Sequence, residues 1–453
     1  MHRDVAVVPG YFDPVSLRPL LTAPIPRIVG LTAFFPFKSD ISPIFSLFKG
    51  KNHYLCKKAI SMIDLTLHNY MREELLSTPV DFERYLMHEI PWEDRMIGIL
   101  GPRGVGKSTL VKQHILAQGD RKDEYLYVSA DHTYLADHTL AELADRFVME
   151  GGRHLVIDEI HKYAGWSREL KQIYDIHSGL QVIFTGSSVL DISKGVADLS
   201  RRALVFEMQG LSFREYLELF KSVKVPAASL DEIIGNKVTL PDTVRPLPLF
   251  REYLASGYYP FSSQPRFDIR IQQVVAQTLE VDIPQYANMT PATSRKLKRL
   301  LAIISGLSPF KPNMLNLSVE LKVSKNDIPD YLYYLEKAGM IGQLRDDTGG
   351  LRGLGKLEKV YLDNPSLMTV LAGGNPDIGN LRETFFYNQT RVRNDVTSSR
   401  ISDFQIGAYT FEVGGHGKGK RQLDKAANGI VVRDDIEYGH GEFVPLWAFG
   451  MNY

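Results

Sequence analysis

The chain has 453 residues, enough for about three domains at roughly 100–200 residues each. Lys plus Arg and Asp plus Glu both number 53, so the net charge is zero and neither favours nor excludes a nucleic-acid partner. The single cysteine, Cys56, excludes an internal disulfide and favours a reducing setting. No run approaches the roughly 18 apolar residues of a membrane span, so we expect no membrane partner and a cytoplasmic location.

Proline is concentrated at the beginning of the chain. Seven of the 24 prolines lie in the first fifty residues, where no helical or strand period persists. Residues 1–57 are therefore predicted to form an irregular N-terminal extension. A start codon placed too far upstream is an alternative explanation, with Met62 or Met71 as the true start.

Strands and helices alternate after a helical stretch that begins near Lys58 and leads to Pro91. The predicted strands are Met96–Leu100, Tyr125–Ala130, Leu155–Ile157, Gln181–Thr185 and Ala203–Met208. The predicted helices are Ser108–Ala117, Leu140–Glu150 and Arg168–Ile176. Strands separated by helices indicate a parallel sheet covered on both faces, so residues 58–240 are predicted to be an α/β domain.

The second half of the chain changes pattern twice. The Pro-rich segment Leu240–Pro248 is expected to be a joint, and Phe267–Gln343 is mostly helical. Tyr331–Gly339 has apolar residues at 332, 335 and 338 and a glycine stop, which resembles the last helix of a winged helix with Ile341–Leu362 as its wing. Residues 241–353 are therefore predicted to be a helical lid and a winged-helix-like domain. Residues 354–453 are predicted to be a small α/β domain, with strands near Ala408–Val413, Gly429–Val432 and Phe443–Phe449.

The segment Gly101-Pro-Arg-Gly-Val-Gly-Lys-Ser108 fits the phosphate-loop pattern G-x-x-x-x-G-K-[ST]. Glycines let backbone N–H groups converge on an anion, and the following helix directs its positive end at the same phosphates. Lys107 is expected to contact the β- and γ-phosphates and Ser108 to ligate Mg²⁺, so ATP and Mg²⁺ are the expected cofactors. The expected nucleotide-binding residues are Gly101, Pro102, Arg103, Gly104, Val105, Gly106, Lys107, Ser108 and Thr109.

Two further segments supply polar groups at strand ends. Arg153–Glu159 is a buried strand that ends in two acids, of which Asp158 is expected to hold magnesium and Glu159 to polarise the attacking water. In Val182–Ser188, Thr185 or Ser187 could orient that water. The alternatives are an acidic turn for the first segment and a turn or helix cap for the second.

Arg202, in Leu199-Ser-Arg-Arg202, precedes the last predicted strand of the sheet. An arginine from a neighbouring subunit can stabilise the charge that develops during phosphoryl transfer. A solvated or salt-bridged surface pair is the alternative role, and the residues alone favour it.

These segments together resemble a prokaryotic family of AAA-type ATPases. The resemblance lies in Gly101–Ser108, Leu155–Glu159, Phe184–Ser188 and then Arg202 followed by Gly210-Leu-Ser-Phe-Arg-Glu-Tyr216. Members of that family join the ATPase to a winged helix and a restriction-endonuclease-like region of uncertain function. The resemblance implies that Arg202 is an arginine finger, although this chain has Arg201 where members usually have glycine. It also implies that activity needs a homo-oligomer.

The C-terminal half carries two groups of charged residues. A basic cluster on the helical region could meet DNA phosphates or form a solvated helix face, and consists of Arg295, Lys296, Lys298 and Arg299. Glu383, Asp403 and Glu412 follow the helix–strand–strand order of a restriction-endonuclease-like core, in which such acids hold Mg²⁺. The lysine expected two residues after the second strand acid is replaced by Gly414, and Lys418 or Lys420 would have to substitute. We therefore expect a degenerate, non-cleaving domain.

The residues support three functions. The first is an ATPase that drives a conformational switch on an unidentified partner, with DNA as one candidate. The second is an ATP-gated nuclease, which Gly414 disfavours. The third is a non-catalytic DNA-binding or scaffold protein, which Glu159 disfavours because a pure binding module does not need a water-activating acid.

Overall fold

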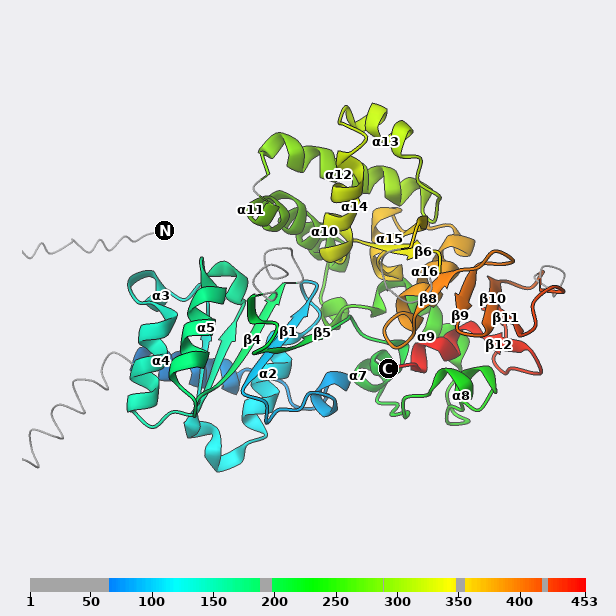
Figure 1. Ribbon diagram of the computed structural model, residues 1–453. Coiled ribbons are helices and arrows are strands. Elements are labelled where there is room, and N and C mark those ends of the chain that lie inside the picture. Colours follow the sequence, from blue (N-terminus) through cyan, green and yellow to red (C-terminus); the bar gives the residue numbers. More distant parts are fainter. Residues whose placement is uncertain (1–64, 188–197, 288, 348–354, 418–422) are drawn as a thin grey trace, which may run out of the picture. The chain divides into compact units, whose positions relative to one another are not determined.

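The computed structural model describes residues 65–187, 198–287, 289–347, 355–417 and 423–453 (Figure 1). The predicted N-terminal extension, Lys418 and Lys420 lie outside these residues. In the described part of the chain, no helix is long and apolar enough to cross a membrane.

Five parallel strands form the first sheet, in the order β2-β3-β4-β1-β5. They are β1 (Met96–Gly101), β2 (Tyr125–Ser129), β3 (His154–Asp158), β4 (Gln181–Ser187) and β5 (Leu204–Glu207). All five correspond to predicted strands. β4 lies between β1 and β3, with Ile99 opposite Thr185 and Ile157 opposite Phe184. The carboxyl ends of β1, β4 and β3 are therefore neighbours, and the loops that follow them share one edge of the sheet.

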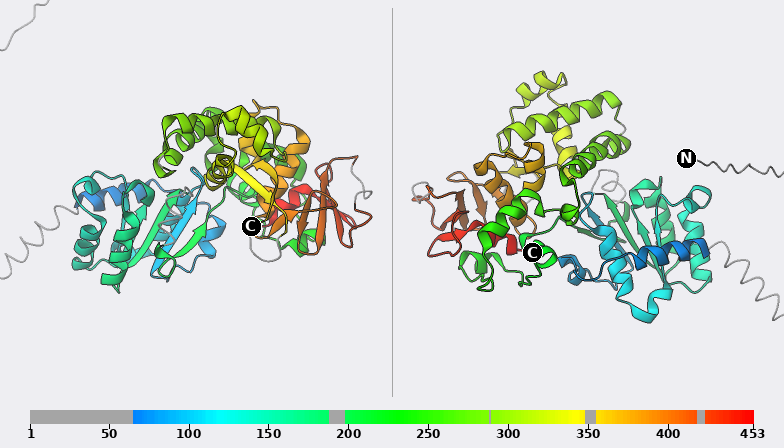
Figure 2. Two further views of the ribbon diagram at one scale, coloured as in Figure 1. Left: turned by 45° about the horizontal axis from the view of Figure 1, so that its top comes forward. Right: turned by 180° about the vertical axis from the view of Figure 1, so that it is seen from behind.

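Side chains alternate along the strands and separate two apolar faces. The covering helices are α2 (Lys107–Leu116), α4 (Leu140–Met149) and α5 (Trp166–Ile176). Leu126 and Leu155 belong to the core with α4 and α5, whereas their neighbours Tyr127 and Val156 belong to the core with α2. Because helices cover both faces, the residues that point to either face are apolar, and each strand is a mostly apolar run in the sequence. Figure 2 shows helices on both sides of the sheet.

A helical region follows β5. Its elements are α7 (Phe213–Lys221), α8 (Leu230–Ile234), α9 (Pro246–Glu252), α10 (Phe267–Gln277), α11 (Ile283–Ala287), α12 (Pro291–Leu307), α13 (Met314–Leu321) and α14 (Asp327–Lys337). A π-helical turn, η6 (Thr278–Asp282), joins α10 to α11. α14 ends before Gly339, whose φ of 68° is in the left-handed region, as the predicted glycine stop requires. β6 (Ile341–Arg345) and β7 (Leu357–Leu362) then form an antiparallel hairpin.

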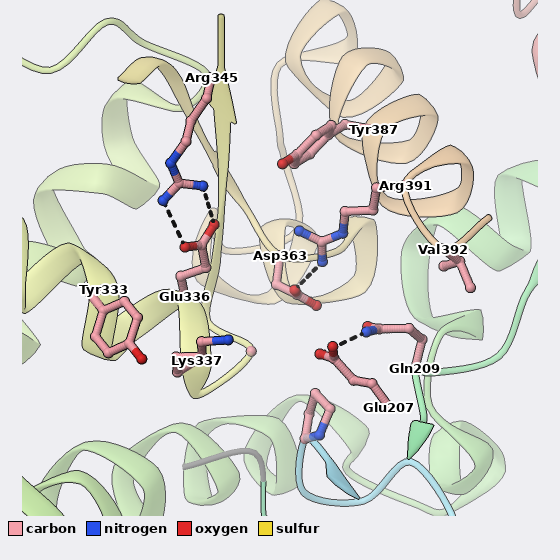
Figure 3. A pocket seen from close by; sticks show the side chains of 12 residues that line it. Glu207, Gln209, Tyr333, Glu336, Lys337, Arg345, Asp363, Tyr387, Arg391 and Val392 are labelled. Atoms are coloured by element: carbon pink, nitrogen blue, oxygen red, sulfur yellow. Dashed lines mark hydrogen bonds and ion pairs between the residues drawn. The ribbon is translucent and has the colours of Figure 1, made fainter. Parts of the chain in front are cut away.

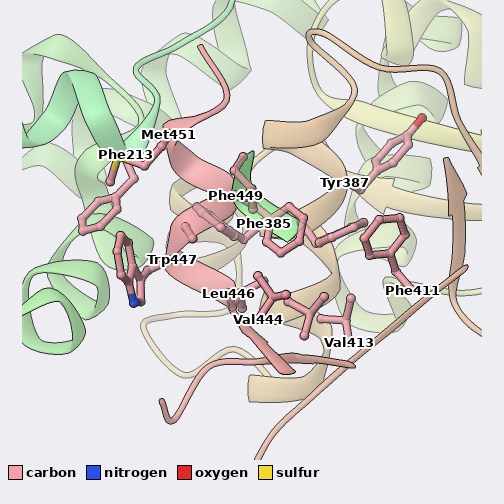
Figure 4. Close-up of a cluster of buried hydrophobic side chains, with 14 of the residues drawn as sticks. Phe213, Phe385, Tyr387, Phe411, Val413, Val444, Leu446, Trp447, Phe449 and Met451 are labelled. Carbon is pink, nitrogen blue, oxygen red and sulfur yellow. The ribbon is translucent and has the colours of Figure 1, made fainter. Parts of the chain in front are cut away.

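The last hundred residues form a second sheet, in the order β12-β11-β10-β9-β8. The elements are α15 (Pro365–Leu371), α16 (Ile378–Thr390), β8 (Val396–Ser398), β9 (Phe404–Ile406), β10 (Tyr409–Gly414), β11 (Gly429–Arg433) and β12 (Phe443–Pro445). β8, β9 and β10 are antiparallel, and β11 runs parallel to both β10 and β12. Phe385 of α16 packs in a buried cluster with Phe411, Val444 and Phe449 (Figure 4).

Three sequence predictions differ from the structure. The predicted strand Phe443–Phe449 ends at Pro445 and continues as a 3₁₀ helix, Leu446–Met451, because a short, fully buried apolar run does not distinguish strand from helix. The predicted joint Leu240–Pro248 already contains the start of α9, since proline suits the first turn of a helix. The helical prediction for Phe267–Gln343 extends into β6. Ser61–Tyr453 forms one compact unit, and the boundaries at residues 240 and 353 stay predictions.

Candidate active site

The phosphate loop connects β1 to α2 with two glycines in the left-handed region. Gly104 has φ 79° and Gly106 has φ 102°, conformations that a residue with a Cβ rarely adopts. At Gly101 a Cβ would lie 2.2 Å from the carbonyl oxygen of Met208, at the end of β5. Each of these three positions therefore requires glycine for a local reason, and the loop leads directly into the start of α2, the arrangement that binds phosphate in P-loop proteins.

Lys107 is folded onto its own loop. Its ammonium donates to the carbonyl oxygens of Gly101, at 2.9 Å, and Pro102, at 2.8 Å. Burial lowers the pKa of Lys107 to about 8, although the charges of Asp158 and Glu159 act to raise it. A phosphate anion at the loop would favour the charged ammonium further, because an opposite charge at short range favours the ionised form.

Asp158 ends β3 and is 5% exposed. One carboxylate oxygen accepts from the hydroxyl of Tyr127 at 2.7 Å, and the other accepts from the hydroxyl of Thr185 on β4. Each oxygen of an ionised carboxylate has two acceptor positions, so each keeps one for a further donor or a metal-bound water. We therefore find that Thr185 orients Asp158 in this structure.

Glu159 has the backbone conformation of a constrained residue. Its φ of 50° is unusual for a residue with a side chain, and its N–H donates to the Thr185 hydroxyl at 3.1 Å. Its carboxylate pairs with Lys162 and, at 3.7 Å, with Arg103 of the phosphate loop. Strained conformations of this kind are found where the surrounding structure determines the position of a functional group.

Ser187 has a different partner from Thr185. Its N–H donates to Nδ1 of His161 at 3.2 Å, and burial lowers the pKa of that imidazole to about 4. This contact holds the loop after β3 against the end of β4. His154 contacts Gln181 at 2.7 Å and stacks on Tyr125, so both histidines have structural contacts.

Lys107, Ser108, Asp158, Glu159 and Thr185 form what we call the sheet-edge site. The site suits Mg²⁺ because Ser108, at the start of α2, offers a hydroxyl and Asp158 retains acceptor positions. Phosphate oxygens and waters complete such a site, since Mg²⁺ keeps several waters and is commonly bound through one or two carboxylates.

A buried ion pair between Arg84 and Glu215 contacts the phosphate loop, and the sequence did not predict it. The guanidinium of Arg84 donates to Glu215 at 3.0 and 3.1 Å, to the carbonyl oxygen of Val105, and to those of Gln209 and Gly210 at 2.8 and 2.9 Å. Glu215 belongs to the Leu-Ser-Phe-Arg-Glu-Tyr segment, whose capping box was a readable signal in the sequence. No sequence pattern identified Arg84 as its partner.

Arg202 lies away from the sheet-edge site of its own chain. It lies two residues before β5, at the amino end of a parallel strand, whereas the site lies at the carboxyl ends. Its guanidinium pairs with Asp175 at 3.0 and 3.1 Å, near the end of α5. The structure therefore does not bring Arg202 to Asp158 or Glu159, and a finger role requires a second copy of the chain.

The three C-terminal acids lie near one another and near an unpredicted lysine. Lys359 of β7 reaches Glu383 at 3.0 Å and Asp403 at 3.6 Å. Burial raises the pKa of Asp403 to about 6, with contributions from the charges of Glu383 and Glu412. The hydroxyl of Ser402 donates to the buried carboxylate of Glu412. Across the described ranges, no cluster of three or more His, Cys, Asp or Glu side chains has an arrangement that could hold a metal ion.

A separate polar cavity of about 440 Å³ borders the phosphate loop at Pro102 (Figure 3). Its charged side chains are largely paired with each other: Arg345 with Glu336 at 3.0 Å, and Arg391 with Asp363. Of the sheet-edge site's residues, none is among those that line the cavity. The cavity is therefore enclosed by the loop, the end of β5, α14 and the C-terminal end of α16.

Comparison with known proteins identifies an AAA domain in the same part of the chain. A family model described as an AAA domain matches residues 93–217, and a model for a domain of unknown function matches residues 247–377. The chain is similar to an uncharacterized protein of Methanocaldococcus jannaschii, MJ1637, with 25% identity over 310 residues that cover 62% of this chain. The chain spans 63% of the length of that relative.

Solved structures give a distant likeness. The RuvB Holliday junction branch migration motor of Thermotoga maritima has 17% identity and a TM-score of 0.25, over 62% of this chain and 89% of that one. AMPPCP-bound DnaA from Aquifex aeolicus has 13% identity and a TM-score of 0.25, over 60% and 88%. TM-scores this low carry no argument about partners. The family match, the strand order and the phosphate loop show that the chain contains an AAA-type P-loop domain.

Proposed function

We propose that the chain binds ATP with Mg²⁺, hydrolyses it, and uses the cycle to drive a conformational switch that acts on an unidentified partner. The observation that carries the proposal is the convergence of three loops at one sheet edge. The loop after β1 presents Lys107 and Ser108, β3 ends in Asp158 and Glu159, and β4 presents Thr185 between them.

Each group has a task for which its chemistry is suited. Lys107 and the N-terminus of α2 would bind the β- and γ-phosphates, and Ser108 with Asp158 would hold Mg²⁺, which neutralises charge on the phosphates. Glu159 would accept a proton from the attacking water. Thr185 fixes Asp158 through its hydroxyl and also accepts the Glu159 N–H, so it positions both acids.

Contacts across the chain favour a switch over a domain that only stores nucleotide. The glycine that ends α14, Gly339, lies so close to the loop that a Cβ there would come within 2.5 Å of the Pro102 ring. Helix α12, the bridge from Phe310 to Val360, helices α13 and α14 and the β6–β7 hairpin follow the order of a winged helix. A movement of the loop on phosphate binding would therefore reach the proposed winged helix directly.

The acidic side chains of α14 disfavour DNA as a partner of this helix. The recognition helix of a winged helix approaches phosphates, but α14 carries Asp327, Asp330 and Glu336, and like charges repel. The basic residues of α12 stay a candidate DNA surface, although Lys298 already pairs with Glu280 at 2.7 Å.

The test is phosphate release and equilibrium binding of a fluorescent ATP analogue, with and without single- and double-stranded DNA. Lys107→Ala should lose binding, because the β- and γ-phosphate contact is removed. Glu159→Gln should keep binding and lose roughly 10²- to 10⁴-fold in turnover, since an amide cannot accept the proton. Wild-type affinity in the lysine variant would contradict the assignment of the phosphate loop.

A further inference from the structure

Arg103 is the phosphate-loop residue that contacts both the proposed catalytic acid and the helical region beyond the sheet. We propose that Arg103 senses the γ-phosphate: a triphosphate draws its guanidinium from Asp282 and Glu159, which links nucleotide state to the helical region. The inference rests on the proposed function and adds to it a positioning residue that distinguishes ATP from ADP.

The contact to the helical region is a bidentate ion pair. Nε and Nη2 of Arg103 both reach the carboxylate of Asp282, the latter at 2.8 Å. Asp282 is 3% exposed and ends the π-helical turn η6, where it also accepts from Gln277 at 3.4 Å. Two parallel hydrogen bonds from a planar guanidinium fix orientation as well as distance, so this pair positions η6 relative to the loop.

The third nitrogen of Arg103 faces the catalytic acid. Nη1 lies 3.7 Å from Glu159, whose carboxylate also pairs with Lys162. Two cations therefore share Glu159, one from the phosphate loop and one from the turn after β3. Removing Arg103 from this group would leave Glu159 paired with Lys162.

A γ-phosphate would compete for Arg103 on chemical grounds. Guanidinium binds phosphate in the same bidentate manner as carboxylate, and a triphosphate carries more negative charge than either acid. The side chain lies within the electrostatic field of Lys107, whose pKa the charge of Arg103 acts to lower. The competition is specific for ATP, because ADP brings no γ-phosphate to the end of the loop.

The release of Asp282 would also affect contacts of the helical region beyond η6. Phe261 lies between α9 and α10 of the helical region. It packs on the loop so closely that a Cβ at Gly104 would lie 2.5 Å from its ring. Arg103 and Gly104 are adjacent, so the helical region contacts the loop at two neighbouring residues. A simple brace between η6 and the loop is the alternative role for the Arg103–Asp282 pair, and it predicts different behaviour.

The experiment measures the affinity of ADP and of a non-hydrolysable ATP analogue, together with phosphate release, for wild type and variants. Arg103→Gln should weaken the ATP analogue about 10- to 100-fold, the loss expected for a hydrogen bond to a charged group, and leave ADP within a few-fold. Asp282→Asn should bind the ATP analogue as tightly as wild type or tighter, because it removes a competitor for the guanidinium.

Two further variants keep the test decisive. Arg103→Gln leaves Asp282 buried without its partner, so the double variant Arg103→Gln/Asp282→Asn removes both charges and should show the same loss of ATP over ADP preference. Arg382→Gln removes a part-buried pair between α16 and Asp434, the residue after β11, at 2.6 Å. It should leave the affinities for ADP and for the ATP analogue unchanged.

The outcomes separate this inference from the proposed function. If wild type and Lys107→Ala bind both nucleotides equally poorly, the proposed function and the inference fail together. If wild type prefers ATP and the double variant keeps that preference, only the inference fails. A brace would lower the affinity for ADP and the ATP analogue equally in both single variants, and that result would also overturn the role of Arg103.

Discussion

The ion pair between Arg84 and Glu215 allows a quantitative test of what holds the phosphate loop in shape. Arg84 is 4% exposed and Glu215 is fully buried. Glu215→Gln keeps the shape of the side chain and its place in the capping box, but it leaves the guanidinium without a counter-charge. An uncompensated buried charge costs about 3–5 kcal/mol. For the compact unit Ser61–Tyr453, with an entropy of unfolding of about 2 cal/mol/K per residue, that lowers the midpoint of thermal unfolding by about 4–6 °C.

The same variant should weaken nucleotide binding. Arg84 also donates to the carbonyl oxygen of Val105, in the middle of the loop, so a displaced guanidinium would release that backbone. The assays are thermal unfolding followed by circular dichroism and titration of a fluorescent ATP analogue. We expect a lower midpoint and a lower affinity from the one substitution.

A matched control exists in the same chain. Glu232 occupies the same third position of a capping box, after Ser229 at the start of α8, but it is exposed. Glu232→Gln should leave both the midpoint and the affinity close to wild type. If the Glu215 and Glu232 variants unfold at the same temperature, the buried pair contributes no more than a helix cap, and the reasoning is wrong.

Three further predictions concern other sites. Arg202→Ala should lower turnover with little change in ATP affinity, and an equal mixture with Glu159→Gln protein should regain activity; normal turnover by a monomeric Arg202 variant would contradict this. Burial lowers the pKa of His114 to about 4, whereas an unfolded imidazole titrates near 6.5. The unfolded chain thus binds more protons in this window, stability falls as pH drops from 6.5 towards 4, and urea unfolding of His114→Phe should lose less stability there. Plasmid incubated with Mg²⁺ or Mn²⁺ should show little nicking, because Lys359 already pairs with two of the C-terminal acids; nicking that disappears in Glu412→Ala would refute this.

Much of the first sheet could be predicted because its signals are local. Each strand is a mostly apolar run, and two of them end in a residue with a clear conformational or chemical role, Gly101 of β1 and Asp158 of β3. The phosphate-loop motif specifies its own backbone through Gly104 and Gly106, so the eight consecutive residues 101–108 were enough to predict its shape. Predicting the position of Thr185 required one further step, the strand order. That order follows once the loops are assigned to one sheet edge.

Contacts between distant residues could not be read in the same way. Arg84 and Glu215 are 131 positions apart, and Arg103 and Asp282 are 179 apart, so no periodicity relates them. Lys359 was missed because the search for a catalytic lysine followed the strand of Glu412, whereas the lysine reaches the acids from β7. The strand β8 is three residues long and carries no alternation that would distinguish it from a loop.

The phosphate loop is in contact with the rest of the chain at four consecutive residues, and this explains why its motif alone does not describe its behaviour. Pro102 lies against Gly339, Arg103 pairs with Asp282, Gly104 lies under Phe261, and the Val105 carbonyl accepts from Arg84. Three of those partners come from the helical region after β5, and the fourth precedes β1. A displacement of the loop by a bound phosphate would therefore change several contacts at once. Coupling between two sites is reciprocal, so a change in one of these contacts would alter phosphate affinity by the same free energy with which phosphate alters that contact. A partner that binds the helical region should for this reason change ATP affinity even if it never touches the nucleotide.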